Sequence, residues 1–260
     1  MKIFKRILLN TFRERKVYMF NTVMSVLLGF IPVLIMIFLW NKIYESGLKI
    51  DNFNKNSIIT YFFWVYIVSN ITEASTIARK ISEDIRSGSI NNVLIKPINH
   101  LRYTFLLYLC EKIVDTIIIV IPSIIFALLA RDYISIDPEK IAPFLLVLIL
   151  GCILNFLIYY IIGLSSFWSV NNNGIIQLWK NLISIVSGNK FPITFLPMFF
   201  QNILIVLPFE YTVYLPISIL LGKSLSITII IIELFWIIFM YILSKIIWKN
   251  GVALNEGVGM

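Results

Sequence analysis

The chain has 260 residues, of which 59% are apolar and 14% are charged, and its mean hydropathy is +0.88. Soluble globular domains contain about 45–50% apolar and about 25% charged residues, so this composition excludes a soluble protein and indicates one that faces the lipid bilayer. The net charge of +8 does not indicate nucleic-acid binding, because the basic residues flank long apolar segments and no polar domain remains to carry a basic surface.

The first sixteen residues combine apolar and basic side chains at helical spacing. One face carries Ile3, Phe4, Ile7, Leu8 and Phe12, and the opposite face carries Lys2, Lys5, Arg6 and Arg13. This pattern predicts an N-terminal amphipathic helix that lies in the cytoplasmic membrane interface. The alternative is a simple basic flank that orients the first membrane span.

Six apolar segments predict six transmembrane helices. In chain order they are Val17–Trp40, Ile58–Ala78, Thr104–Ala130, Ile141–Trp168, Ile175–Ser187 and Leu225–Trp248. Lys and Arg in the flanks divide 13 to 7 in favour of the side that holds both ends of the chain. The positive-inside rule therefore predicts cytoplasmic termini. Since the sequence shows no internal repeat or low-complexity linker, we expect residues 1–260 to form one domain.

The segment between the fifth and last predicted spans, Gly188–Lys223, is apolar but rich in proline. Its prolines are Pro192, Pro197, Pro208 and Pro216. Proline removes a backbone donor and breaks a helix, so we expect two short helices that dip into the membrane and turn back. Such re-entrant backbone is tolerated only where protein or a water-filled cavity covers it, which suggests a pathway.

The stretch Arg79–Tyr103 predicts a helical elbow on the cytoplasmic side. Ile77, Ile81 and Ile85 continue a helical stripe out of the second span, with Glu83, Asp84 and Arg86 on the other faces. Gly88 is expected to end this helix in a left-handed conformation, and Ser89 to cap a second short helix holding Leu94, which Pro97 ends. The elbow suits docking into a groove of a soluble partner, although an ordinary cytoplasmic loop is the alternative.

The sequence from Glu83 to Pro97, EDIRSGSINNVLIKP, resembles the signature of type-2 ATP-binding cassette (ABC) permeases, in which acidic residues precede Gly, small residues, Leu and Pro. The basic N-terminal helix, the six spans and the proline-broken segment are similar to the same family. The resemblance implies an all-α integral membrane permease of the cell membrane. It implies that residues 79–97 contact a separate ATPase subunit, with Glu83, Asp84, Arg86, Gly88, Ser89, Leu94 and Pro97 as coupling residues. It also implies a dimer of permeases that exports its cargo.

Charged residues inside spans are functional candidates, because a charge in the bilayer is costly. Glu111, Lys112 and Asp115 lie in the third predicted span, where Lys112 and Asp115 are spaced to pair on one helical face. Glu233 is the one acidic residue of the last predicted span. Glu233 could bond to a neighbouring helix, stay protonated, or face the translocation path. Glu111 and Asp115 are further candidates for residues of that path. Glu73 is expected at the interface.

The sequence contains few residues that could form an enzyme active site. Gly222-Lys223-Ser224 resembles the end of a phosphate-binding loop, but that motif needs a Gly where Ile217 stands. We therefore expect ATP and Mg²⁺ to bind a partner ATPase and this chain to be no enzyme. His100 is the only histidine and is expected to be a solvated loop residue; with Cys110 and Cys152 in apolar stretches, no metal site is expected. A non-transporting membrane scaffold or immunity protein remains the alternative function.

Overall fold

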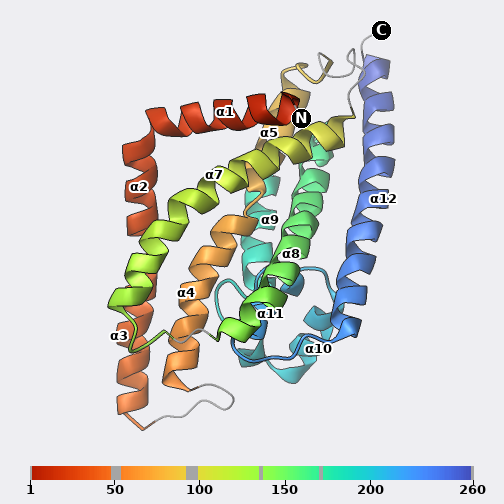
Figure 1. Ribbon diagram of the computed structural model, residues 1–260. Helices are drawn as coiled ribbons and strands as arrows, with labels where there is room; N and C mark the ends of the chain where they lie inside the picture. Colours follow the sequence, from red (N-terminus) through yellow and green to blue (C-terminus); the bar gives the residue numbers. More distant parts are fainter. Residues whose placement is uncertain (1, 48–53, 92–98, 135–136, 170–171, 259–260) are drawn as a thin grey trace.

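The computed structural model describes residues 2–47, 54–91, 99–134, 137–169 and 172–258, and these residues form helices, turns and loops. The first helix, α1 (Lys2–Val17), and the end of the last helix, α12 (Ile227–Val258), lie at the same end of the molecule (Figure 1). We call this the terminal end and the other the distal end. The long helices run between the two ends.

Four helices among the described residues are long and apolar enough to cross a membrane. They are Met19–Glu45, His100–Leu129, Pro138–Phe167 and Ile227–Leu254. They correspond to the first, third, fourth and last predicted spans. The second and fifth predicted spans are helical but are not among the four: α4 (Lys55–Thr72) begins with polar residues and α9 (Asn172–Val186) has 15 residues. A helix of that length spans about 22 Å, which is shorter than the hydrocarbon core of about 30 Å.

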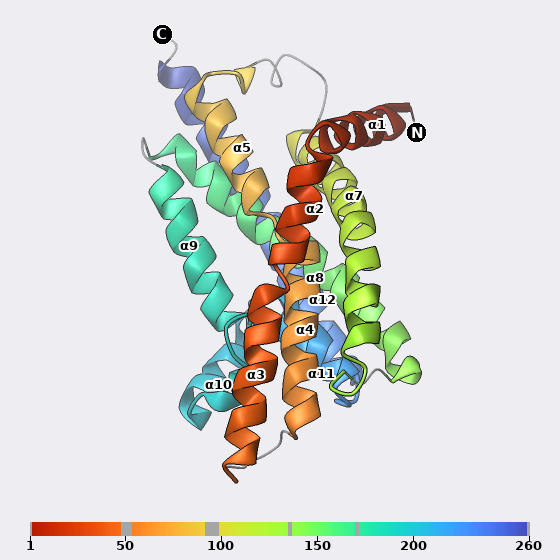
Figure 2. The ribbon, with the colours of Figure 1, turned by 90° about the vertical axis from the view of Figure 1, so that its left-hand side faces the viewer.

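The first predicted span consists of two helical segments, α2 (Met19–Leu28) and α3 (Ile31–Glu45). Pro32 stands in the first turn of α3, the position where its missing N–H costs nothing. The helix is interrupted at Gly29, where a Cβ atom would clash with the ring of Tyr66. Tyr66 also donates a hydrogen bond of 2.7 Å to the carbonyl of Val26. The glycine therefore allows α4 to approach this interruption closely (Figure 2).

The second predicted span, Ile58–Ala78, is not one continuous helix. The helix α4 ends at Thr72, and α5 (Ser75–Arg86) begins after Glu73 and Ala74, whose backbones leave the helical conformation. The Glu73 carboxylate accepts a hydrogen bond of 2.7 Å from the backbone N–H of Ser75, which satisfies a donor at the start of α5. Apolar residues keep a helical spacing on both sides of the break, so the sequence alone does not predict it.

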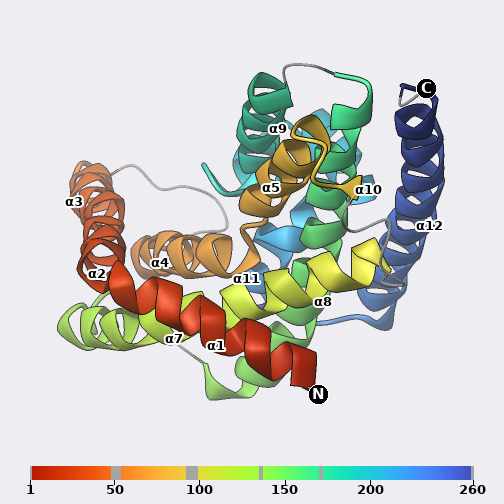
Figure 3. The ribbon, with the colours of Figure 1, turned by 90° about the horizontal axis from the view of Figure 1, so that it is seen from above.

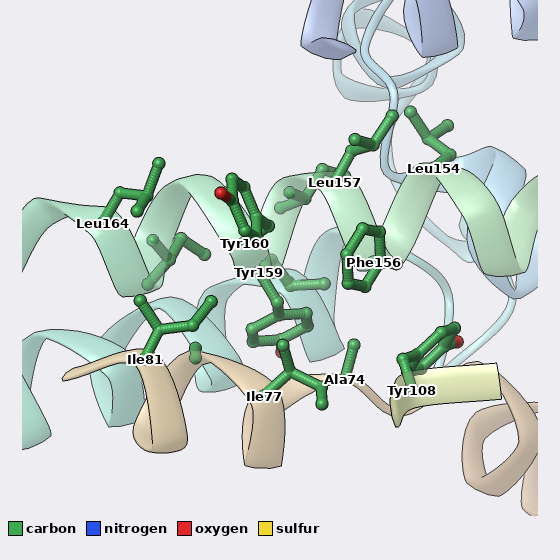
Figure 4. Close-up of a cluster of buried hydrophobic side chains, with 14 of the residues drawn as sticks. Ala74, Ile77, Ile81, Tyr108, Leu154, Phe156, Leu157, Tyr159, Tyr160 and Leu164 are labelled. Atoms are coloured by element: carbon green, nitrogen blue, oxygen red, sulfur yellow. The ribbon is translucent and has the colours of Figure 1, made fainter. Parts of the chain in front are cut away.

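Helix α8 (Pro138–Leu164) is the centre of the packing. In its most apolar stretch 50% of the residues are buried within the chain, compared with 11–17% in the other three long helices. It contacts α5, α11 and α12, and Figure 3 shows α12 standing against it at the edge of the molecule. The largest core cluster joins α8 residues to the apolar face of α5 (Figure 4). The face of α5 formed by Ile77, Ile81 and Ile85 is therefore buried on α8.

The proline-rich segment forms two short helices at the distal end, α10 (Met198–Val206) and α11 (Tyr214–Leu220), linked by turns. Pro197 directly precedes α10, and Pro216 lies in the first turn of α11. Each proline stands where a helix has no partner for the missing N–H. Proline placement therefore explains why this segment does not form one long helix.

Helix α1 runs across the terminal end, roughly perpendicular to α2, and packs on the first half of α7 (His100–Leu129) (Figures 1 and 3). Its exposed apolar side chains include Leu9 and Phe12, and its basic residues Arg15 and Lys16 lie in the last turn. Both the sequence pattern and the orientation suit a helix parallel to a membrane surface.

Candidate functional site

The end of α5 forms a tight turn at the terminal end of the molecule. Gly88 has φ +72°, a left-handed conformation that is open to glycine without strain, and a side chain there would meet no neighbouring atom within 4 Å. Its N–H donates to the carbonyl of Ile85, and the N–H of Ile90 donates to that of Asp84 at 3.0 Å. These bonds satisfy carbonyls at the helix C-terminus, so the structure confirms that Gly88 takes a left-handed conformation just after the end of α5.

The predicted coupling side chains of this turn have different surroundings. Glu83 and Arg86 are exposed, whereas the Asp84 carboxylate accepts a hydrogen bond of 2.9 Å from the Ser89 hydroxyl. Asp84 and Ser89 therefore stabilise the turn, whereas the side chains of Glu83 and Arg86 are exposed to the surroundings. Leu94 and Pro97 lie outside the described residues, as does the second short helix predicted there.

Polar contacts that were not predicted from the sequence connect α5 to α9. Lys180 lies 3.2 Å from the carboxylate of Glu73 and 3.3 Å from the hydroxyl of Ser75, so one lysine holds both sides of the α4–α5 break. One turn further along α5, Arg79 donates to Gln177 at 3.1 Å. A sequence signal was present, because Lys180 is a lone cation in the fifth predicted span and Glu73 a lone anion in the second.

The break leaves backbone carbonyls at the end of α4 without helical partners, and side chains from other helices satisfy them. The carbonyl of Thr72 accepts from Tyr108 at 3.2 Å and from the Asn155 amide at 2.6 Å. The carbonyl of Asn70 accepts from the Lys112 ammonium at 3.2 Å. A cation at a helix C-terminus also interacts favourably with the helix dipole. Lys112, only 9% exposed, therefore stabilises the end of α4.

Glu111 and Asp115 lie in a polar cavity of about 360 Å³, the α2–α7 cavity. It is bounded by α2, α4 and α7, by Arg15 of α1, and by Glu73 and Thr76 at the α4–α5 break. Asp115 binds Arg15 at 2.9 Å and Lys112 at 3.5 Å, so the predicted pair of Lys112 and Asp115 is present. Among the described residues the Glu111 carboxylate makes neither a hydrogen bond nor an ion pair. The cavity lining therefore contains three carboxylates: Asp115 is shared by two cations, Glu73 pairs with Lys180, and Glu111 has no ion pair among the described residues.

Glu233 lies in the first third of α12 and has 0% of its surface exposed. Neither of its carboxylate oxygens has a hydrogen-bond partner among the described residues. The structure does not bring Glu233 together with Glu111 or Asp115 in the α2–α7 cavity. The three predicted intramembrane residues therefore do not form one site.

The expectation that His100 is a solvated loop residue is wrong. The helix α7 begins at His100, whose side chain is buried and hydrogen-bonds through Nδ1 to the Tyr160 hydroxyl at 2.8 Å. Its ring stacks on Trp248 of α12, with ring centres 4.3 Å apart. The stretch before Thr104 is polar enough to resemble a loop, but α8 and α12 approach it in space and cover the imidazole.

Comparison with known proteins adds the decisive observation. The family model described as ABC-2 family transporter protein matches residues 30–259, which is most of the chain. The chain belongs to the ABC-2 transporter family. No curated protein matches it. Together with the apolar helices, the family assignment identifies a membrane protein of a transporter family whose members work with ABC ATPase subunits.

Proposed function

We propose that the chain is the membrane-spanning permease subunit of an ATP-driven ABC exporter in the cell membrane. It forms a translocation path as a dimer and takes its energy from separate ATPase subunits, which bind ATP and Mg²⁺. The observation that carries this proposal is the family match over residues 30–259. The arrangement of α5 supports it, because α5 presents the exposed Glu83 and Arg86 at the terminal end.

The proposed topology has six spans, with α4 and α9 crossing as the second and fifth. The terminal end faces the cytoplasm, α1 lies in that interface, and α10 and α11 re-enter the membrane from outside. The Lys and Arg distribution supports this orientation. Other parts of the chain bury much of α4, and Lys112 satisfies a carbonyl at its end, which supports a place for α4 at membrane depth. In α9, Lys180 pairs with Glu73.

Coupling is proposed to pass through the elbow of residues 79–97. When the ATPase subunits close on nucleotide, they would move the α5 turn, and the buried Ile77–Ile81–Ile85 face would transmit the movement to α8. Lys180 bridges the α4–α5 break, so α9 would follow the same motion. Packed interfaces of this kind transmit rigid-body shifts because they are not continuously deformable.

The first experiment is purification of the full chain from native membranes in mild detergents, with mass spectrometry of the proteins that come with it. We expect a stoichiometric soluble protein that carries a phosphate-binding loop. Recovery of the chain without such a protein in every detergent would reject the permease proposal in favour of the scaffold function.

The elbow is tested separately with Gly88→Pro, because proline cannot adopt φ +72° and removes the N–H bonded to Ile85. Gly47→Pro is the matched control: Gly47 has φ +85°, donates to Tyr44, has equally open surroundings and lies at the distal end. We expect Gly88→Pro to reduce the recovered ATPase about tenfold, a loss of about 1.4 kcal/mol of binding, and Gly47→Pro to leave it unchanged. Normal ATPase recovery and transport in Gly88→Pro would reject the elbow but not the permease subunit.

A further inference from the structure

The α2–α7 cavity is lined by two cations and three carboxylates that do not pair one to one. One carboxylate, Glu73, pairs with Lys180, which lies outside the lining. The two cations, Arg15 and Lys112, both pair with the single carboxylate of Asp115. This leaves positive charge in excess beside Asp115. The unpaired Glu111 carboxylate leaves negative charge in excess on the same wall of α7. A cavity with one residual charge of each sign suits a zwitterionic ligand with an anionic and a cationic group.

The polar groups of the cavity favour a primary ammonium over a quaternary one. A primary ammonium has three N–H donors, and the lining offers oxygen atoms from Ser25, Asn70 and Glu111. Quaternary ammonium groups are typically bound by cages of several aromatic rings. Among the described residues, Tyr66 is the one aromatic side chain that lines this cavity, and its hydroxyl already donates to Val26.

The position of the cavity indicates where such a ligand would come from. Arg15 belongs to α1, which crosses the terminal end in the orientation of an interfacial helix (Figure 1), so the mouth of the cavity lies at headgroup depth. Apolar side chains are exposed on α2 and α7 beside it, namely Met24, Leu28, Ile117 and Ile121. The helices α2 and α7 lie side by side (Figure 2). A ligand with its headgroup in the cavity would therefore find exposed apolar side chains of both helices beside its acyl chains.

We propose that the α2–α7 cavity binds a phospholipid whose headgroup carries a primary ammonium beside its phosphate, as in phosphatidylethanolamine. Arg15 binds the phosphate through a charge-assisted hydrogen bond, and Glu111 accepts from the ammonium. Asp115 and Lys112 hold Arg15 and the end of α4 in place. The site requires only that the chain lies in a membrane and does not depend on the transport proposal.

The test is lipid titration of the full chain in mild detergent, followed by native mass spectrometry. The probes are phosphatidylethanolamine, its mono-, di- and trimethylated forms and phosphatidylglycerol, all with the same acyl chains. We expect binding to weaken as N–H donors are replaced by methyl groups, to a total of about tenfold for the trimethylated form. Equal binding of all the lipids would overturn the proposal without any variant being needed.

Variants then locate the site. Glu111→Gln is expected to abolish the preference for the primary ammonium, whereas Glu14→Gln, which removes an exposed carboxylate of α1 outside the cavity lining, should keep it. Arg15→Gln should weaken binding of every phospholipid, and Arg13→Gln is its control. A preference that survives in Glu111→Gln would overturn the assignment. If glycerophosphoethanolamine, which has no acyl chains, binds as tightly as phosphatidylethanolamine, the ligand is not a lipid and the proposal is wrong.

Discussion

At the scale of single residues, charged side chains within the apolar helices have contrasting surroundings. Lys112 is buried but satisfied, because its ammonium reaches Asp115 and the carbonyl of Asn70. Glu233 is more deeply buried and its oxygens have no partner among the described residues. Burying an unpaired polar group costs free energy, so Glu233 does not stabilise this conformation of the chain.

The first prediction follows from that contrast. Glu233→Leu should leave the thermal stability of the purified chain unchanged or raise it, because no hydrogen bond is lost and an apolar group replaces an unsatisfied one. Asn155→Leu is the control at a similarly buried position, 5% exposed compared with 0%, and should lose about 0.5–1.5 kcal/mol because the carbonyl of Thr72 keeps only its bond from Tyr108. The measurement is the unfolding midpoint in detergent. Equal destabilisation by both changes would show that Glu233 has a binding partner.

At the scale of helices, glycines on α8 set how closely other segments approach it. A Cβ atom on Gly151 would lie 2.7 Å from the backbone carbonyl oxygen of Tyr211, in the turn between α10 and α11. Near the C-terminus of the same helix, Gly163 permits α5 to approach until a Cβ would lie 3.0 Å from Ala78. Backbone atoms cannot move away as a flexible side chain can, so these contacts fix the distances between the helices.

The second prediction concerns these contacts. Gly151→Ala should destabilise the chain by about 1–3 kcal/mol, because the added methyl group forces α8 and the distal segment apart. Gly174→Ala is the control within a helix: nothing lies within 4 Å of its Cβ, so the change should be neutral or stabilise by up to about 1 kcal/mol. Unfolding midpoints of both variants check this. A stable Gly151→Ala would mean that the distal segment is not packed on α8 as described.

At the scale of the whole molecule, the helices alternate in direction so that chain connections gather at two ends. The ends of α3 and α9 lie at the distal end with α10 and α11, whereas the end of α5 lies at the terminal end with α1 (Figure 1). The alternation fits six membrane crossings with both termini on one side. Ser46 and Ser87 are exposed near these opposite ends, directly before Gly47 and Gly88.

The third prediction tests this topology. In a Cys110→Ser/Cys152→Ser background, Ser87→Cys should react with a membrane-impermeant maleimide only when the cytoplasmic face is accessible. Ser46→Cys should react only from outside, because the two positions lie at opposite ends of the molecule. Labelling of intact cells and of inverted vesicles measures this. Reaction of both cysteines from the same side would contradict the proposed topology.

The features of the candidate site that depend on residues close together in the sequence were predictable. The pairing of Lys112 with Asp115 follows from their spacing on one helix, and the left-handed Gly88 follows from the end of an amphipathic stripe. The burial of His100 was not predictable, since Tyr160 and Trp248 come from other helices. The contacts of Lys112 with Asn70 and of Lys180 with Ser75 join residues 42 and 105 positions apart.

The sequence by itself determined that this is an all-helical membrane protein with a proline-broken distal segment, because hydropathy and proline act on the local chain. Only the tertiary structure decided that α4 and α5 are separate helices, since the break is stabilised by Tyr108, Asn155 and Lys180 from three other helices. It also decided which buried charges are paired. A charge in an apolar helix is visible in the sequence, but its partner depends on how the helices pack.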